Sequence, residues 1–134
     1  MGGRARGWAW LRVLALVAVG GVAGAASRHW LSEALDDGAL PWGTLVANVV
    51  GSAALGVVVR LAARDRREPW WYPMVGVGAL GALTTMSSFQ VEVVLLVDDG
   101  RAPAAGAYVI LTVVLGLVAA WCGTRAARRG AVDT

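Results

Sequence analysis

The chain has 134 residues, of which 57% are hydrophobic and only 16% are charged, with a mean hydropathy of +0.62. Soluble domains carry about a quarter charged residues; here the charges gather in short clusters between long apolar runs, which excludes a water-soluble domain. The net charge of +3 comes from arginines that flank these runs, a pattern that favours membrane insertion over a nucleic-acid partner. Four spans of about 20 residues would fill most of the chain, so we expect one transmembrane domain over residues 1–134.

The first apolar run covers about residues 11–30 and follows a basic N-terminal segment. A cleaved signal peptide begins in the same way, but this run continues through several glycines into Arg28 and His29, and three more apolar runs follow. We therefore predict a retained transmembrane helix. Arg28 is either an anion-attracting group in a vestibule or an ordinary interfacial arginine. His29 has no second ligand nearby and is most simply interfacial.

The second run, about residues 41–62, opens with Pro41 and Trp42, which are typical of a helix start at a membrane interface. Thr44 and Asn48 are four residues apart and so share one helical face. A polar side chain at membrane depth is costly and needs a reason. Asn48 either forms a hydrogen bond with a neighbouring helix, or its amide N–H groups replace water around a passing anion.

The third run, about residues 70–97, is long and irregular. Gly76, Gly78 and Gly81 are followed by a polar stretch from Thr84 to Ser88, which makes a poor continuous helix. We predict a break near the middle of this helix, where freed carbonyls could coordinate a cation. The alternative is an unbroken glycine-rich helix that packs closely against its neighbours.

Three further side chains follow that polar stretch. Met86 and Phe89 are three residues apart and share a face. A phenyl ring there is usually packing, but its positive edge can also face a small anion. Glu92 is the only acid well inside an apolar run, and it is either a proton or cation site, an arginine partner, or a side chain that reaches to the interface.

The fourth run, about residues 103–124, places Tyr108 and Thr112 on one helical face. Cys122, the only cysteine, is most simply a small packing residue. The sequence contains no cluster of nucleophiles, acids and bases or metal ligands, so we do not expect an enzyme.

The arginines predict the orientation in the plasma membrane. With four spans, the N-terminus, the central loop and the C-terminus lie on one side of the membrane. Ten of the twelve arginines lie on that side, and only Arg28 and Arg101 lie on the other. Short arginine-rich segments stay cytoplasmic. Both termini are therefore predicted to be cytoplasmic in this multi-pass protein, whereas a protein that inserts both ways should have almost no bias.

Three segments together resemble the Fluc (CrcB) family of fluoride channels: Gly20 to Arg28, Gly43 to Ser52, and Gly78 to Phe89 followed by Glu92. The resemblance extends from about Gly20 to Gly123. It implies a channel that exports fluoride passively and so lowers its toxicity, built as an antiparallel dimer of four-helix subunits with two pores in the membrane lipid. It also implies a structural sodium ion at the dimer centre, held by backbone carbonyls of Gly81 and Thr84.

The fluoride pathway implied by this resemblance comprises Asn48, Phe89, Met86, Thr44, Tyr108, Thr112, Ser88, Arg28 and Glu92. Two positions depart from the family pattern: Met86 replaces the first of two phenylalanines, and Gly116 stands where a hydroxyl often continues the track. The alternatives are a small multidrug-resistance-like transporter, although the first span has no acid, and a non-conducting partner subunit of a heteromeric channel. The partner in an antiparallel dimer is either a second copy of this chain or an oppositely oriented paralogue, and the arginine bias favours the paralogue.

Overall fold

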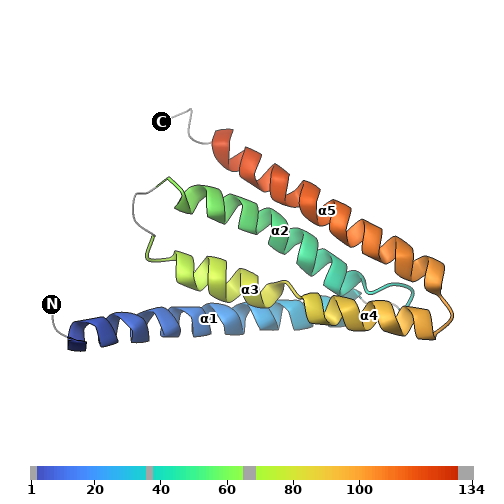
Figure 1. Ribbon diagram of the computed structural model, residues 1–134, viewed down its shortest axis with the longest axis horizontal. Helices are drawn as coiled ribbons and strands as arrows, with labels where there is room; N and C mark the ends of the chain where they lie inside the picture. Colours follow the sequence, from blue (N-terminus) through green and yellow to red (C-terminus); the bar gives the residue numbers. More distant parts are fainter. Residues whose placement is uncertain (1–2, 36–37, 65–68, 130–134) are drawn as a thin grey trace.

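The computed structural model describes residues 3–35, 38–64 and 69–129, and these form helices and short connections (Figure 1). The elements are α1 (Gly3–Leu35), α2 (Trp42–Ala62), a π-helical segment η1 (Pro73–Ala79), α3 (Leu80–Leu83), α4 (Met86–Asp98) and α5 (Ala102–Arg129). Within this part of the chain, four stretches are long and apolar enough to cross a membrane: Gly7–Leu35, Trp42–Ala62, Pro73–Asp98 and Ala102–Arg128. The prediction of an all-α protein with four spans is confirmed.

Helix α1 is longer than the apolar run that it contains. The run covers about residues 11–30, whereas α1 begins at Gly3 and continues past Arg28 and His29 to Leu35. An arginine does not end a helix in a membrane, because its long side chain can reach the interface while the backbone remains hydrogen-bonded. Figure 1 shows the start of α1 extending beyond the other helices.

Glycine residues allow the helices to pack at close range. A methyl group built on Gly20 would lie 1.9 Å from the Met74 carbonyl oxygen, so η1 can pack on α1 only because Gly20 has no side chain. A methyl group on Gly56 of α2 would lie 2.3 Å from the carbonyl oxygen of Ala120 in α5. Close backbone approach of this kind favours helix association where water supplies no driving force.

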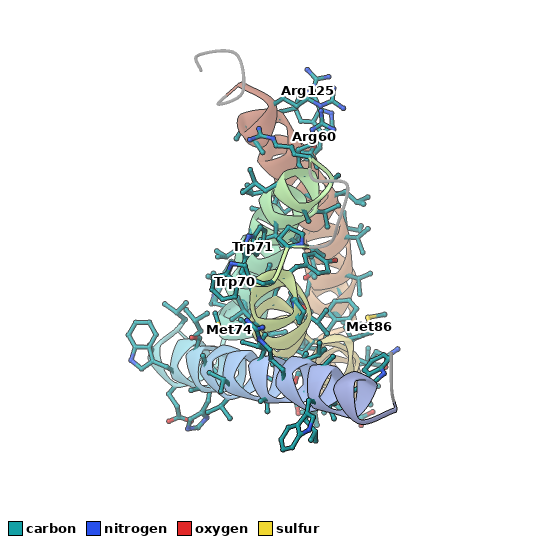
Figure 2. All side chains as sticks on the ribbon, turned by 90° about the vertical axis from the view of Figure 1, so that its left-hand side faces the viewer. Arg60, Trp70, Trp71, Met74, Met86 and Arg125 are labelled. Carbon is teal, nitrogen blue, oxygen red and sulfur yellow. The ribbon has the colours of Figure 1, made fainter. Side chains whose placement is uncertain are left out.

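Helices α2 and α5 lie side by side and run in the same direction (Figure 1). At their far ends Arg64 donates a hydrogen bond to the Ala127 carbonyl, and the Arg125 guanidinium lies 4.5 Å from the centre of the Trp121 ring. Figure 2, which views this end, shows Arg60 and Arg125 on the same side of the bundle. At the opposite end, Arg101 donates hydrogen bonds to the Gly38 and Ala39 carbonyls and so joins the two connections.

The third span is divided at two threonines. Thr84 (φ −79°, ψ 146°) and Thr85 (φ −146°, ψ 128°) are extended between α3 and α4. The glycines before them remain helical, in η1 and α3. The extended residues lie where α4 gains an N-cap, since the Thr85 hydroxyl accepts a hydrogen bond from the Ser88 N–H at 3.2 Å.

Few large side chains are buried in this single chain. The main cluster comprises Leu45, Phe89, Leu96, Ala105 and Tyr108, and lies between α2, α4 and α5. In one apolar 18-residue stretch of each span, between 11% and 28% of the residues are buried. Outward-facing residues such as Val22 and Leu117 are about 70% exposed, which suits a protein whose surface meets lipid or another subunit.

Candidate anion pathway

A half-buried carboxylate joins three helices. Glu92 of α4 accepts a hydrogen bond from the Thr44 hydroxyl of α2 through Oε1 (2.6 Å) and from the Tyr108 hydroxyl of α5 through Oε2 (2.7 Å). Thr44 is 1% exposed and Tyr108 is 0% exposed. Among the residues that the structure describes, Glu92 has no arginine partner, which was one option left open by the sequence; its two oxygens accept hydrogen bonds from hydroxyl groups.

Phe89 packs against this cluster from one turn earlier in α4. Its ring centre lies 5.3 Å from that of Tyr108, with an angle of 41° between the rings, and the side chain is 8% exposed. Met86, one turn before Phe89, is 65% exposed instead, and Figure 2 shows its side chain at the outer edge of the helix bundle. The two residues begin the same helix but occupy different environments.

Asn48 is bonded to the point where the third span is extended. Its Nδ2 donates to the Thr85 carbonyl (3.1 Å), and its Oδ1 accepts from the Thr85 N–H (2.8 Å). The side chain thus replaces a backbone partner that a continuous helix would have supplied. An amide nitrogen carries two N–H groups, so Asn48 can hold Thr85 and still offer a second donor.

Two carbonyls lose their usual donors at this break. In a continuous helix the Gly81 and Thr84 carbonyls would accept from the N–H groups four residues later, those of Thr85 and Ser88. The Thr85 N–H donates to Asn48 and the Ser88 N–H donates to the Thr85 hydroxyl. Gly81 and Thr84, the positions predicted to hold a cation, are therefore left without their helical partners.

A groove of about 470 Å³ runs between α2, the break and α5. Five predicted site residues line it: Asn48, Thr84, Met86, Phe89 and Thr112. The rest of the lining consists of Ser52, Thr85, Gly116 and several apolar side chains. Within the part of the chain that the structure describes, the buried Thr112 hydroxyl has no hydrogen-bond partner. A buried hydroxyl without a partner costs free energy, so it requires an explanation.

A smaller cavity of about 230 Å³ lies at the end of α4, and Glu92, Leu40, Asp99 and Arg101 are among the residues that line it. Glu92 therefore lines this cavity while its oxygens accept hydrogen bonds from the Thr44 and Tyr108 hydroxyls. Arg101 and Ser52 were not among the predicted site residues. An arginine in a short loop and a serine in a small-residue run carry no functional signal in the sequence, and only their positions beside the two cavities mark them.

Five predicted site residues line neither cavity: Thr44, Tyr108, Gly81, Arg28 and Ser88. Arg28 is half-buried on α1 and lines neither the groove nor the smaller cavity. Ser88 belongs to the N-cap of α4, where its hydroxyl accepts a hydrogen bond from the Thr85 hydroxyl at 3.2 Å. Within the described residues, no group of three or more histidine, cysteine, aspartate or glutamate side chains could hold a metal ion.

Residues 15–124 match the protein family described as "CrcB-like protein, Camphor Resistance (CrcB)". The chain is 41% identical over 115 residues to the fluoride-specific ion channel FluC of Vibrio cholerae, a match that covers 83% of this chain and 91% of the relative. It is 42% identical over 119 residues to the FluC channel of Paramagnetospirillum magneticum, covering 84% and 93%, respectively. The chain therefore belongs to the CrcB/FluC family of fluoride channels, a family of ion channels and not of enzymes.

Proposed function

We propose that this protein is a fluoride-selective channel of the plasma membrane that lets fluoride leave the cytoplasm down its gradient. The relatives that cover most of the chain are named fluoride-specific ion channels. The single observation in the structure that carries the proposal is the buried Thr112 hydroxyl, which lacks a partner and borders the same groove as Asn48. A dehydrated anion would supply the missing acceptor.

The chemistry of the groove suits fluoride. A small anion loses a strong hydration shell on entering the membrane, so it needs several hydrogen-bond donors at close range. The second N–H of Asn48 and the hydroxyl of Thr112 provide neutral donors, and the edge of the Phe89 ring adds a weak positive field. None of the residues that line the groove is charged, so nothing there would trap the ion.

We assign Thr44, Glu92 and Tyr108 to one end of the pathway. Their hydrogen-bonded cluster lies between the groove and the smaller cavity, and Phe89 contacts both the groove and Tyr108. Hydroxyl groups that now donate to Glu92 could turn to a passing anion if the carboxylate moves aside. Met86, Ser88 and Arg28 have supporting roles in this scheme: Met86 borders the groove, Ser88 caps α4, and Arg28 attracts anions near the membrane surface.

A sodium ion fits the break. The Gly81 and Thr84 carbonyls have lost their helical donors, and backbone carbonyls freed in this way coordinate alkali cations in membrane proteins. A methyl group built on Gly81 would meet nothing within 4 Å, so this side of the helix is open to a second subunit. Sodium held there by both subunits would supply a structural link at the dimer centre.

The groove is open on one side, which supports a dimeric channel. The antiparallel arrangement and the arginine bias together favour a partner inserted the opposite way, with both termini of this chain in the cytoplasm. Figure 1 places the start of α1 and the end of α5 at the same end of the bundle. An oppositely oriented paralogue would complete the pores, and a second copy of this chain is the alternative.

One other function has a specific observation in its favour. The exposed Met86 and the missing side chain at Gly116 would weaken a pore lined by this chain, as expected for a non-conducting partner subunit. The multidrug exporter alternative has no such support, because Glu92 is engaged by two hydroxyls and the described part of the first span contains no acid between residues 11 and 27.

Fluoride efflux from proteoliposomes tests the proposal. The protein is reconstituted with its oppositely oriented partner, and in parallel alone, into vesicles loaded with fluoride or chloride, and external ion electrodes follow release after a potassium ionophore is added. Release from the chain alone would mean that a second copy serves as the partner. We expect rapid fluoride release and none of chloride. Rapid chloride release would exclude a fluoride-selective channel, and the absence of any release from correctly assembled dimers would favour the non-conducting subunit.

A further inference from the structure

The polar residues of α2 and α5 face each other in successive turns. Thr44 and Tyr108 share the Glu92 carboxylate, and Asn48 and Thr112 line the groove one turn further along both helices. The next turn brings Ser52 opposite Gly116, and after that Gly56 lies against Ala120. The difference in residue number between the two partners is the same in every pair, because the two helices are parallel and closely packed.

The third of these pairs differs from the first two. Both helices contribute a polar side chain at the Thr44 and Asn48 levels, whereas at the Ser52 level α5 has only Gly116. A methyl group built on Gly116 would lie 3.6 Å from Ser52 Oγ, an ordinary contact distance, and nothing else lies within 4 Å of it. Ser52 Oγ therefore borders the space that a side chain on α5 would fill, and both residues line the groove.

We propose that Ser52 donates a hydrogen bond to fluoride at this level, so that α2 supplies the donor that α5 lacks. The inference rests on the proposed channel function. An anion that leaves Asn48 and Thr112 toward the far end of α2 meets Leu55, Val113, Leu117 and Ala120, which are apolar. The Ser52 hydroxyl is the side-chain donor on this part of the groove, and it lies one helical turn from Asn48, within reach of the same ion.

Ser52→Ala tests the assignment. Loss of a hydrogen bond to a charged species should slow fluoride efflux roughly tenfold or more. Dimer yield should remain normal, because this change removes only one hydroxyl from an open groove. The control is Ser27→Ala on α1, where the hydroxyl donates to the Ala23 carbonyl at 2.9 Å and is exposed; it should leave efflux unchanged.

Rescue from the opposite helix separates a donor from a packing role. Adding Gly116→Ser to Ser52→Ala restores a hydroxyl at the same level and should recover most of the lost efflux. Gly116→Ala adds the same Cβ without the hydroxyl and should not. Normal efflux from Ser52→Ala, or equal rescue by Gly116→Ala and Gly116→Ser, would overturn the assignment. Absence of fluoride efflux from the unchanged protein would instead refute the channel function itself.

Discussion

Thr112→Val should make the protein more stable and less active. Valine keeps the branched shape of threonine and removes the buried Oγ1, which has no hydrogen-bond partner among the described residues. A buried polar group without a partner costs about 1–3 kcal/mol. Because Thr112 itself is partly exposed along the groove, we expect the low end of this range, a gain of about 1 kcal/mol in the free energy of unfolding.

The same change should slow fluoride transport. If Thr112 donates to the anion during permeation, its loss removes an interaction with a charged species of about 1.5–3 kcal/mol, and each 1.4 kcal/mol added to a barrier slows a rate about tenfold. Efflux from proteoliposomes should therefore fall at least tenfold. Thermal unfolding in detergent, followed by tryptophan fluorescence, measures the stability of the same preparation.

Thr124→Val is the matched control on the same helix. The Thr124 hydroxyl donates to the Trp121 carbonyl at 2.7 Å, and the residue does not line the groove. This variant should leave efflux unchanged and should not raise stability. Thr112 would not be a donor to the anion if Thr112→Val transported fluoride at the normal rate. A loss of stability in this variant would mean that the Thr112 hydroxyl already has a hydrogen-bond partner.

Four further results are expected. Asn48→Leu should reduce efflux, since it removes the donor to fluoride. It should also reduce dimer stability, because the Thr85 N–H and carbonyl lose their partners, at a cost of about 1–3 kcal/mol for each group; normal thermal stability would contradict this. Glu92→Leu should lower the unfolding temperature more than Glu92→Gln, because leucine leaves the buried Thr44 and Tyr108 hydroxyls without an acceptor. Replacing sodium by lithium should reduce the dimer fraction in size-exclusion chromatography, and full retention of the dimer would count against a cation at Gly81 and Thr84. Reporters fused to the C-terminus, one active only in the cytoplasm and one only outside, should give signal from the cytoplasmic reporter alone, and comparable signals would mean dual insertion.

The sequence determined the class of protein because each membrane-spanning helix is recognisable from its own stretch of residues. Long apolar runs bounded by arginines indicate four membrane-spanning helices whatever their packing, since each helix satisfies its own backbone in lipid. The polar residues in those runs could also be selected without a structure. Asn48, Glu92, Tyr108 and Thr112 were candidates simply because polar groups are expensive at membrane depth.

The partners of those residues were decided by the tertiary structure. Glu92 is 48 residues from Thr44 and 16 residues from Tyr108, and no periodicity within one helix relates positions on three different helices. Asn48 was open to two interpretations, and the structure pairs it with Thr85 while leaving a second N–H available. The extended residues could not be located from the sequence, because the glycines weaken helix preference but remain helical. Asn48 pairs with the N–H and carbonyl of Thr85, whose hydroxyl caps α4, while Thr84 still donates to the Leu80 carbonyl.

The pairing of Ser52 with Gly116 is the clearest example of a feature that only the packing of the helices determines. In the sequence, Ser52 belongs to a run of small residues and Gly116 marks a missing hydroxyl. The parallel packing of α2 and α5 sets them opposite each other at the edge of the groove, 3.6 Å from Oγ to the place of a Cβ. That register depends on close contact at Gly56 and Ala120 one turn away, a long-range packing effect that the order of residues along either helix does not contain.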